Sequence, residues 1–87
     1  MSSHVQKFTT EDAEKTSKTI GVDWNKEKFK VEDLRIGMDV ELEHGTENNL
    51  TNVTNDDPVM TAKIALAHLL ESPIYYKLLE KMEEKFE

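Results

Sequence analysis

The sequence predicts an all-α fold, a small single domain of three to four short helices. Two observations support this prediction. The 87 residues suffice for one domain and leave no room for two. Apolar residues recur with helical spacing, and residues that commonly begin or end helices flank these segments. The chain has no cysteine, which excludes disulfides, thiolate metal sites and cysteine nucleophiles. We expect residues 1–7 to form a flexible tail and residues 8–87 to form the domain.

The first helix is predicted over residues 10–20. Thr9 is a favourable N-cap, Asp12 lies three positions later as in a capping box, and Gly21 follows the last turn. Few residues of this helix are apolar, so we expect it to lie on the surface. A polar connector follows, and its single tryptophan, Trp24, is interpreted as a cover for one end of the core.

The second helix is predicted over residues 32–44, although its pattern is ambiguous. Apolar residues alternate with glycine or acidic residues over 36–42, which is typical of a strand, but they also recur every four positions over 34–42, which is typical of a helix. Two acidic residues at the start favour the helix, and Gly45 stands just past its end. Gly37 in its interior indicates a close approach between helices.

Two further helices are predicted after a polar loop over residues 45–57. Asp56 or Asp57 is expected to cap a helix over 58–70, which is apolar on nearly all sides and therefore central. A Ser-Pro pair ends it and precedes a last helix over 73–85. We expect the apolar stripe of this last helix to pack against the core; its members are Tyr75, Leu78, Leu79, Met82 and Phe86.

Two mirrored spacings provide the candidate site. Glu41 and His44 are three residues apart, as are His68 and Glu71, and residues three apart share one face of a helix. If the two faces meet, two carboxylates and two imidazoles suit a divalent metal such as zinc, iron or manganese. The alternative is that each pair is a hydrogen-bonded or ion-paired helix end without a ligand. Residues with a possible supporting role are Glu43, Tyr75 and Tyr76.

The charge of the chain limits its partners. The formal net charge is −7 and the sequence pI is about 4.9, a balance that repels nucleic acids and anionic membrane surfaces. The start of the sequence has no apolar export segment, and no apolar stretch is long enough to cross a bilayer. We therefore expect a cytoplasmic protein that binds neither nucleic acid nor membrane.

Two sequence elements resemble a known family. One is the E-x-E-H element formed by Glu41, Glu43 and His44; the other is an I-A-x-x-H-L-x-E-x-P-x-Y-Y element that begins at Ile64 and includes His68. Together they are similar to small uncharacterised proteins of bacteria, archaea and tailed phages, over nearly the whole chain beyond residue 7. The resemblance implies no activity, substrate or cofactor. Its motif, however, coincides with the His/Glu residues of the candidate site.

Three functional hypotheses follow. The first is a non-enzymatic structural or protein-interaction module that binds a protein partner or self-associates, for which an exposed apolar patch would be the mark. The second is a domain that binds a divalent metal or small ligand through its His/Glu cluster. The third is a hydrolase-type enzyme with a His/Glu acid–base pair. We expect that the protein is not an enzyme and assign no catalytic residue.

Overall fold

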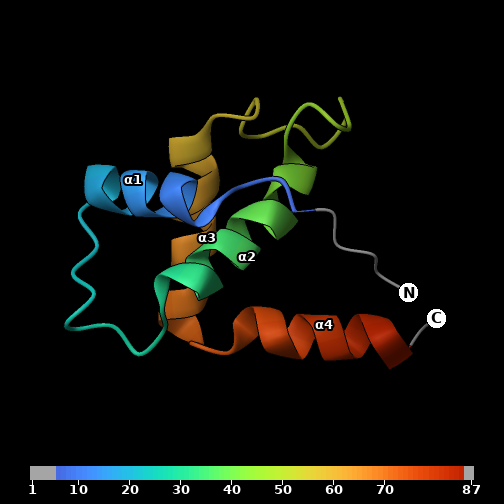
Figure 1. The fold of residues 1–87 in the computed structure, drawn as a ribbon. Helices are drawn as coiled ribbons and strands as arrows, with labels where there is room; N and C mark the ends of the chain where they lie inside the picture. Colours follow the sequence, from blue (N-terminus) through green and yellow to red (C-terminus); the bar gives the residue numbers. More distant parts are fainter. Residues whose placement is uncertain (1–5, 86–87) are drawn as a thin grey trace.

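The computed structural model describes residues 6–85, with side chains through Met82, and this part of the chain contains helices and no strand. The predicted all-α class is therefore confirmed. Figure 1 shows α2 crossing α3, with α1 beside both and α4 along one end of the molecule. Within the same residues, no helix combines the length and hydrophobicity needed to cross a bilayer. The elements are α1 (Thr10–Ile20), α2 (Val31–Glu41), the 3₁₀ turn η1 (Leu42–His44), α3 (Pro58–Glu71) and α4 (Tyr75–Lys85).

The ends of α1 are formed as the sequence predicts. The Thr9 hydroxyl accepts a hydrogen bond from the Asp12 N–H, and the Asp12 carboxylate accepts one from the Thr9 N–H at 2.9 Å. Gly21 ends the helix with a φ of 83°, a left-handed conformation that favours glycine. The Trp24 indole then donates to the Ser17 hydroxyl at 3.3 Å, and Trp24 packs against the core from the connector.

The core lies where α2 and α3 meet. Gly37 of α2 makes this contact possible, because a Cβ atom there would lie 2.5 Å from the Tyr76 ring and 3.0 Å from the Ala65 Cβ atom. The predicted close approach at Gly37 is thus present. The buried apolar residues of the core are Ala13, Phe29, Leu34, Met38, Ala62, Ala65, Leu69 and Tyr76.

Ion pairs and hydrogen bonds that were not predicted from the sequence attach the start of the described chain to α2. Arg35 contacts Glu32 at 2.8 Å and Asp39 at 2.9 Å. Asp39, which is buried, also accepts hydrogen bonds from the N–H groups of Lys7 and Phe8. The hydrogen bond from Arg35 lowers the pKa of Glu32 below its usual value. The remainder of the predicted tail, residues 1–5, lies outside the described residues.

Hydrogen bonds join the two ends of the loop between η1 and α3. The His44 carbonyl accepts hydrogen bonds from the Val53 N–H at 2.6 Å and the Thr54 N–H at 3.3 Å. Thr46 donates to the Asp56 carboxylate through both its N–H and its hydroxyl, and these bonds lower the pKa of Asp56. Asp57, one of the two predicted caps, accepts from the Val59 N–H at the start of α3.

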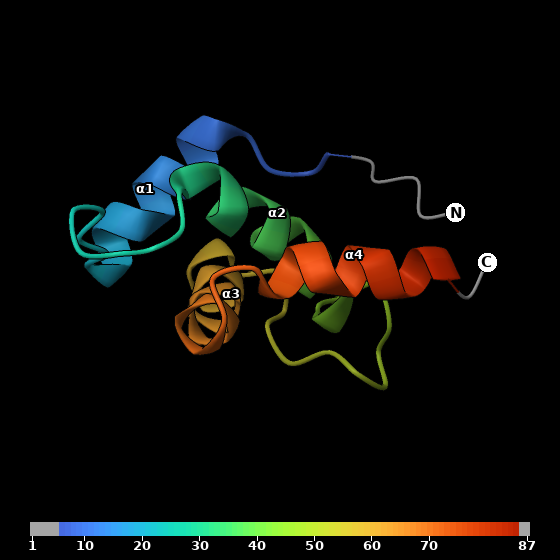
Figure 2. The same cartoon turned by 90° about the horizontal axis from the view of Figure 1, so that it is seen from below.

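The stripe on α4 does not pack as predicted. Tyr76 is buried and Tyr75 and Leu79 pack partly against the core, but Leu78 and Met82 are 50% and 55% exposed. Since Leu79 lies one position further along and still packs against the core, Leu78 is exposed because it lies on the outer face of α4. Figure 2 also shows that the end of α4 runs beyond α2 and α3. Phe86, the last member of the predicted stripe, lies outside the described residues.

Candidate functional site

Glu41 is the centre of the candidate site. Its side chain is buried at the C-terminal end of α2, where Oε2 accepts a hydrogen bond from the Tyr76 hydroxyl at 2.7 Å. The His68 Nε2 atom lies 3.7 Å from the same oxygen, and the His44 Nε2 atom lies 3.5 Å from Oε1. Both imidazoles predicted for the site therefore meet at one carboxyl group. We call Glu41, His44, His68 and Tyr76 the Glu41 cluster.

Aromatic rings hold the cluster in place. The His68 ring stacks on Tyr75, with centroids 4.4 Å apart and an angle of 7° between the planes. The Tyr76 ring stands nearly perpendicular to both neighbours, and its edge occupies the space that Gly37 leaves free. Burial and the hydrogen bond to Glu41 raise the pKa of Tyr76 far above its usual range, so its hydroxyl keeps the proton that it donates.

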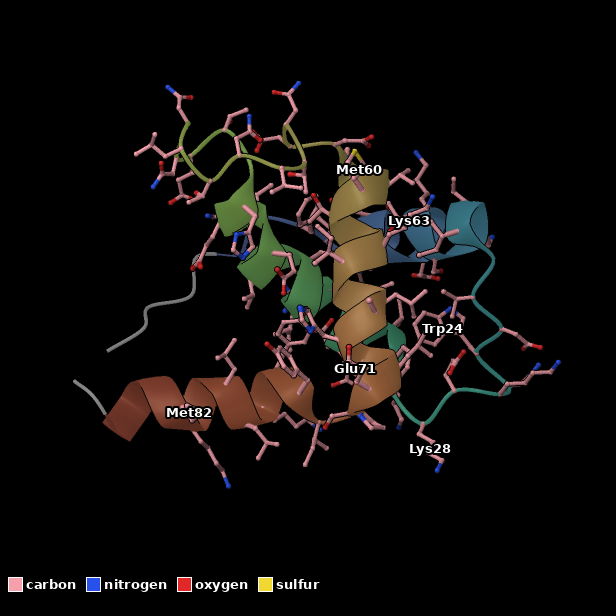
Figure 3. All side chains as sticks on the ribbon, turned by 180° about the vertical axis from the view of Figure 1, so that it is seen from behind. Trp24, Lys28, Met60, Lys63, Glu71 and Met82 are labelled. Carbon is pink, nitrogen blue, oxygen red and sulfur yellow. The ribbon has the colours of Figure 1, made fainter. Side chains whose placement is uncertain are left out.

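Two of the predicted residues lie apart from the cluster. Glu71 is exposed on the last turn of α3, as its label in Figure 3 shows, and it lines a groove with Lys28 and Leu70. The carboxylate near His68 is instead Glu41, from a different helix. Glu43 is exposed and shares a second groove with His44 at the start of the loop.

The contacts of the Glu41 cluster connect three helices, and they do not have the arrangement of a metal site. Glu41 from α2 meets His68 from α3 and Tyr76 from α4. The two imidazoles approach different oxygens of Glu41, and one of these oxygens already accepts the Tyr76 hydrogen bond. Between residues 6 and 85, no group of three or more His, Asp or Glu residues is arranged to hold a metal ion.

A second candidate site is the outer face of α4. Ile74, Leu78 and Met82 are spaced four residues apart and are between 49% and 55% exposed. Leu70, at the end of α3 and before the turn that precedes α4, is 58% exposed. Isolated exposed apolar residues are common on proteins, but a row of them indicates a contact surface. We call Ile74, Leu78 and Met82 the α4 stripe.

Comparisons with known proteins identify the family without assigning an activity. Neither the curated proteins nor the solved structures gave a match. One family model matches residues 13–85, which includes all but the first turn of α1 and both candidate sites. Its description is "Protein of unknown function (DUF5661)". The chain belongs to this family of proteins of unknown function.

Proposed function

We propose that the domain is a protein-interaction module and that the α4 stripe is its contact surface, covered by an apolar helix face of a partner protein. The observation that carries this proposal is the exposure of three apolar side chains in one row. The apolar face of an amphipathic helix is normally buried, either against the core of its own protein or against a partner protein. The protein's own core instead covers the side of α4 that carries Tyr76, and Tyr75 and Leu79 pack partly against it.

Burial of the α4 stripe alone does not provide enough free energy for binding. Burying a large aliphatic side chain contributes about 1.5–3 kcal/mol, and each member of the stripe is already about half buried. Three such residues therefore contribute roughly 2–4 kcal/mol, which is less than the roughly 4–15 kcal/mol that association costs in lost freedom of motion. A partner must gain additional free energy from polar or charged contacts beside the stripe.

Site-specific photocrosslinking tests the proposal. A photoreactive phenylalanine analogue replaces Leu78 in cells that normally produce the protein, and Lys15, which is exposed on α1, is replaced as the matched control. We expect a defined protein to crosslink from position 78 and not from position 15. That protein, once purified, should lose at least about tenfold in affinity for the double variant Leu78→Ser/Met82→Ser. Equal affinity for the wild type and this variant would refute the proposal.

The Glu41 cluster is proposed as a structural joint. Its carboxyl group connects α2, α3 and α4 and so holds the base of α4 in place. The competing candidate, a divalent-metal site, is favoured by the meeting of two imidazoles at one carboxyl group. Thermal unfolding with added metal separates the two.

A further inference from the structure

One face of α3 is exposed, although this helix is apolar on nearly all sides. Met60 and Leu70 are 42% and 58% exposed, and Ala67 between them is exposed as well. Figure 3 shows α3 in front of α2, with Met60 near its start and Glu71 near its end. A helix that is apolar all round is normally buried all round, and the described chain leaves this face uncovered. We use the name α3 face for Met60, Lys63, Ile64, Ala67, Leu70 and Glu71.

Two opposite charges stand on the α3 face at equal distances from its middle. Lys63 comes four residues before Ala67, and Glu71 comes four residues after it. Since four residues make slightly more than one helical turn, the two charges lie about one turn from Ala67 in opposite directions and on opposite sides of it. Both side chains are exposed, and neither forms an ion pair with a residue that the structure describes.

Charges from the neighbouring connector do not neutralise this pattern. Lys26, Glu27 and Lys28 line a groove with Glu71, but no ion pair joins either lysine to Glu71 within the described residues. Figure 3 shows Lys28 beyond the end of α3, whereas Lys63 and Glu71 lie along the helix. The α3 face itself therefore carries one positive and one negative charge, both available to a partner.

A second copy of the chain is complementary to the α3 face. If two α3 helices pair antiparallel about a two-fold axis at Ala67, the axis exchanges both the direction along the helix and the two sides of the face. Lys63 of each copy then meets Glu71 of the other, and Ile64 meets Leu70. Ala67 meets itself, and its small side chain lets the two helices approach closely.

A parallel pair of α3 helices is not complementary. It would place Lys63 beside Lys63 and Glu71 beside Glu71, which are like charges. The net charge of −7 per chain does not prevent the antiparallel pair, because the α3 face has no net charge of its own. Repulsion between the more distant charges is screened by salt beyond about 8 Å at physiological ionic strength.

We infer that the α3 face binds a second copy of the chain, as an antiparallel pair of α3 helices about a two-fold axis at Ala67. This inference goes beyond the proposed function, because it concerns a different helix and does not depend on the α4 stripe. Each copy contributes only a few aliphatic side chains, so the interface is small and the dimer should form at high protein concentration.

Sedimentation equilibrium of the full chain at up to about 1 mM tests the inference. We expect a reversible dimer whose dissociation constant rises at least about tenfold in Lys63→Glu and in Glu71→Lys. These two substitutions change the net charge in opposite directions, so general repulsion does not explain a loss in both. Lys15→Glu, at an exposed position of α1, is the matched control and should keep the wild-type dissociation constant.

Restoring the opposite charges should restore the dimer. In the double variant Lys63→Glu/Glu71→Lys, each copy again presents complementary charges to the other. A mixture of the two single variants should likewise form a mixed dimer with about the wild-type dissociation constant, because each Glu of one chain meets a Lys of the other. Ala67→Glu places two carboxylates together on the axis and should leave the protein monomeric.

A crosslink tests the position of the axis. The chain has no cysteine, so Ala67→Cys introduces a single one, and a short bismaleimide should join two copies through it. Lys15→Cys is the matched control and should give no crosslinked dimer.

Four results would overturn the inference. They are a wild type that stays monomeric at about 1 mM, wild-type affinity in both single charge variants, a mixture of these variants that binds no better than each alone, and equal crosslinking from positions 67 and 15. A dimer that Leu78→Ser/Met82→Ser dissociates and that Ala67→Glu retains would overturn it as well, by placing the second copy on the α4 stripe. Photocrosslinking from position 78 tests the proposed function separately.

Discussion

At the scale of single residues, Gly37 and Tyr76 determine how α4 is attached. The absence of a side chain at Gly37 lets the Tyr76 ring lie against α2, and the Tyr76 hydroxyl then reaches Glu41. A helical glycine destabilises by up to about 1 kcal/mol relative to alanine. Its presence here is explained by the space that the ring occupies.

Gly37→Ala should therefore destabilise the protein, although it improves helix propensity. The new methyl group would lie 2.5 Å from the Tyr76 ring, and overpacking of this kind costs about 1–3 kcal/mol. We expect a net loss of about 1–2 kcal/mol in the free energy of unfolding, measured with urea. In a Tyr76→Leu background the same substitution should cost less, and an equal cost in both backgrounds would contradict the steric explanation.

Tyr76→Phe should lower the free energy of unfolding by about 1–3 kcal/mol, because the buried Glu41 carboxyl group loses its hydrogen-bond donor. Tyr75→Phe is the matched control, since the stacking on His68 is retained, and it should cost less than about 0.5 kcal/mol. Equal losses from both substitutions would show that the hydrogen bond to Glu41 has no special role.

The pH dependence of the same tyrosine has a defined sign. Its pKa is raised in the folded state, so its contribution to stability is complete below the ordinary value of 10.0 and is lost as the pH rises toward the folded-state pKa. Wild-type stability should thus fall above pH 10, and Tyr76→Phe should show a shallower fall. Identical alkaline slopes would contradict this.

Metal addition tests the remaining role of the Glu41 cluster. If the cluster is a structural joint, zinc, manganese or iron should leave the melting temperature of the wild type equal to that in EDTA. A metal present at about 100 times its dissociation constant would instead stabilise the fold by about 2.7 kcal/mol. Stabilisation of the wild type that His68→Ala abolishes would replace the structural assignment with a metal site.

At the scale of elements, local signals in the sequence predicted where helices begin and end, but they did not predict which residues of different helices contact one another. The capping box at Thr9 and the glycine at position 21 predicted both ends of α1, because caps depend on residues within one turn. The pairing of His68 with Glu41 and of Tyr76 with Glu41 depends on how three helices cross, so a spacing rule within one helix suggested Glu71 instead. The Arg35 pairs with Glu32 and Asp39 were predictable from spacings of three and four.

The Arg35 network at the start of α2 gives an acid-side prediction. The pKa of Glu32 is lowered in the folded state, so its contribution to stability is present above the ordinary value of 4.5 and is lost as the pH falls through the folded-state pKa. Stability measured by urea unfolding should decrease less steeply below pH 4.5 in Glu32→Gln than in the wild type. The same steepness in both proteins would show that the ion pair does not stabilise the fold.

At the scale of the whole molecule, amphipathicity predicted that α4 has an apolar stripe but not what covers it. A period in the sequence shows which residues share a face; it does not show which part of that face a neighbouring helix covers. The core covers the side of α4 that carries Tyr76 and, in part, Leu79, so Leu78 and Met82 on the outer face stay half exposed. The apolar residues of α4 that the core leaves uncovered form the proposed contact surface.

The oligomeric state tests what covers the same surface. If the partner is a different protein, as proposed, the isolated Ala67→Glu variant, whose α3 face cannot pair, should sediment as a monomer of about 10.0 kDa over a wide range of concentration. Sedimentation equilibrium at low and high salt measures this directly. A dimer that Leu78→Ser/Met82→Ser dissociates would show that a second copy covers the α4 stripe.

The closed base of the loop after η1 has a practical consequence. The hydrogen bonds of His44 with Val53 and of Thr46 with Asp56 hold the two ends of the loop together, while Leu50 at its tip is 96% exposed. Lengthening a loop whose ends are already held costs little chain entropy. A fluorescent protein or affinity tag inserted between Asn49 and Leu50 would therefore leave the helices assembled and keep both ends of the chain unmodified for imaging or purification.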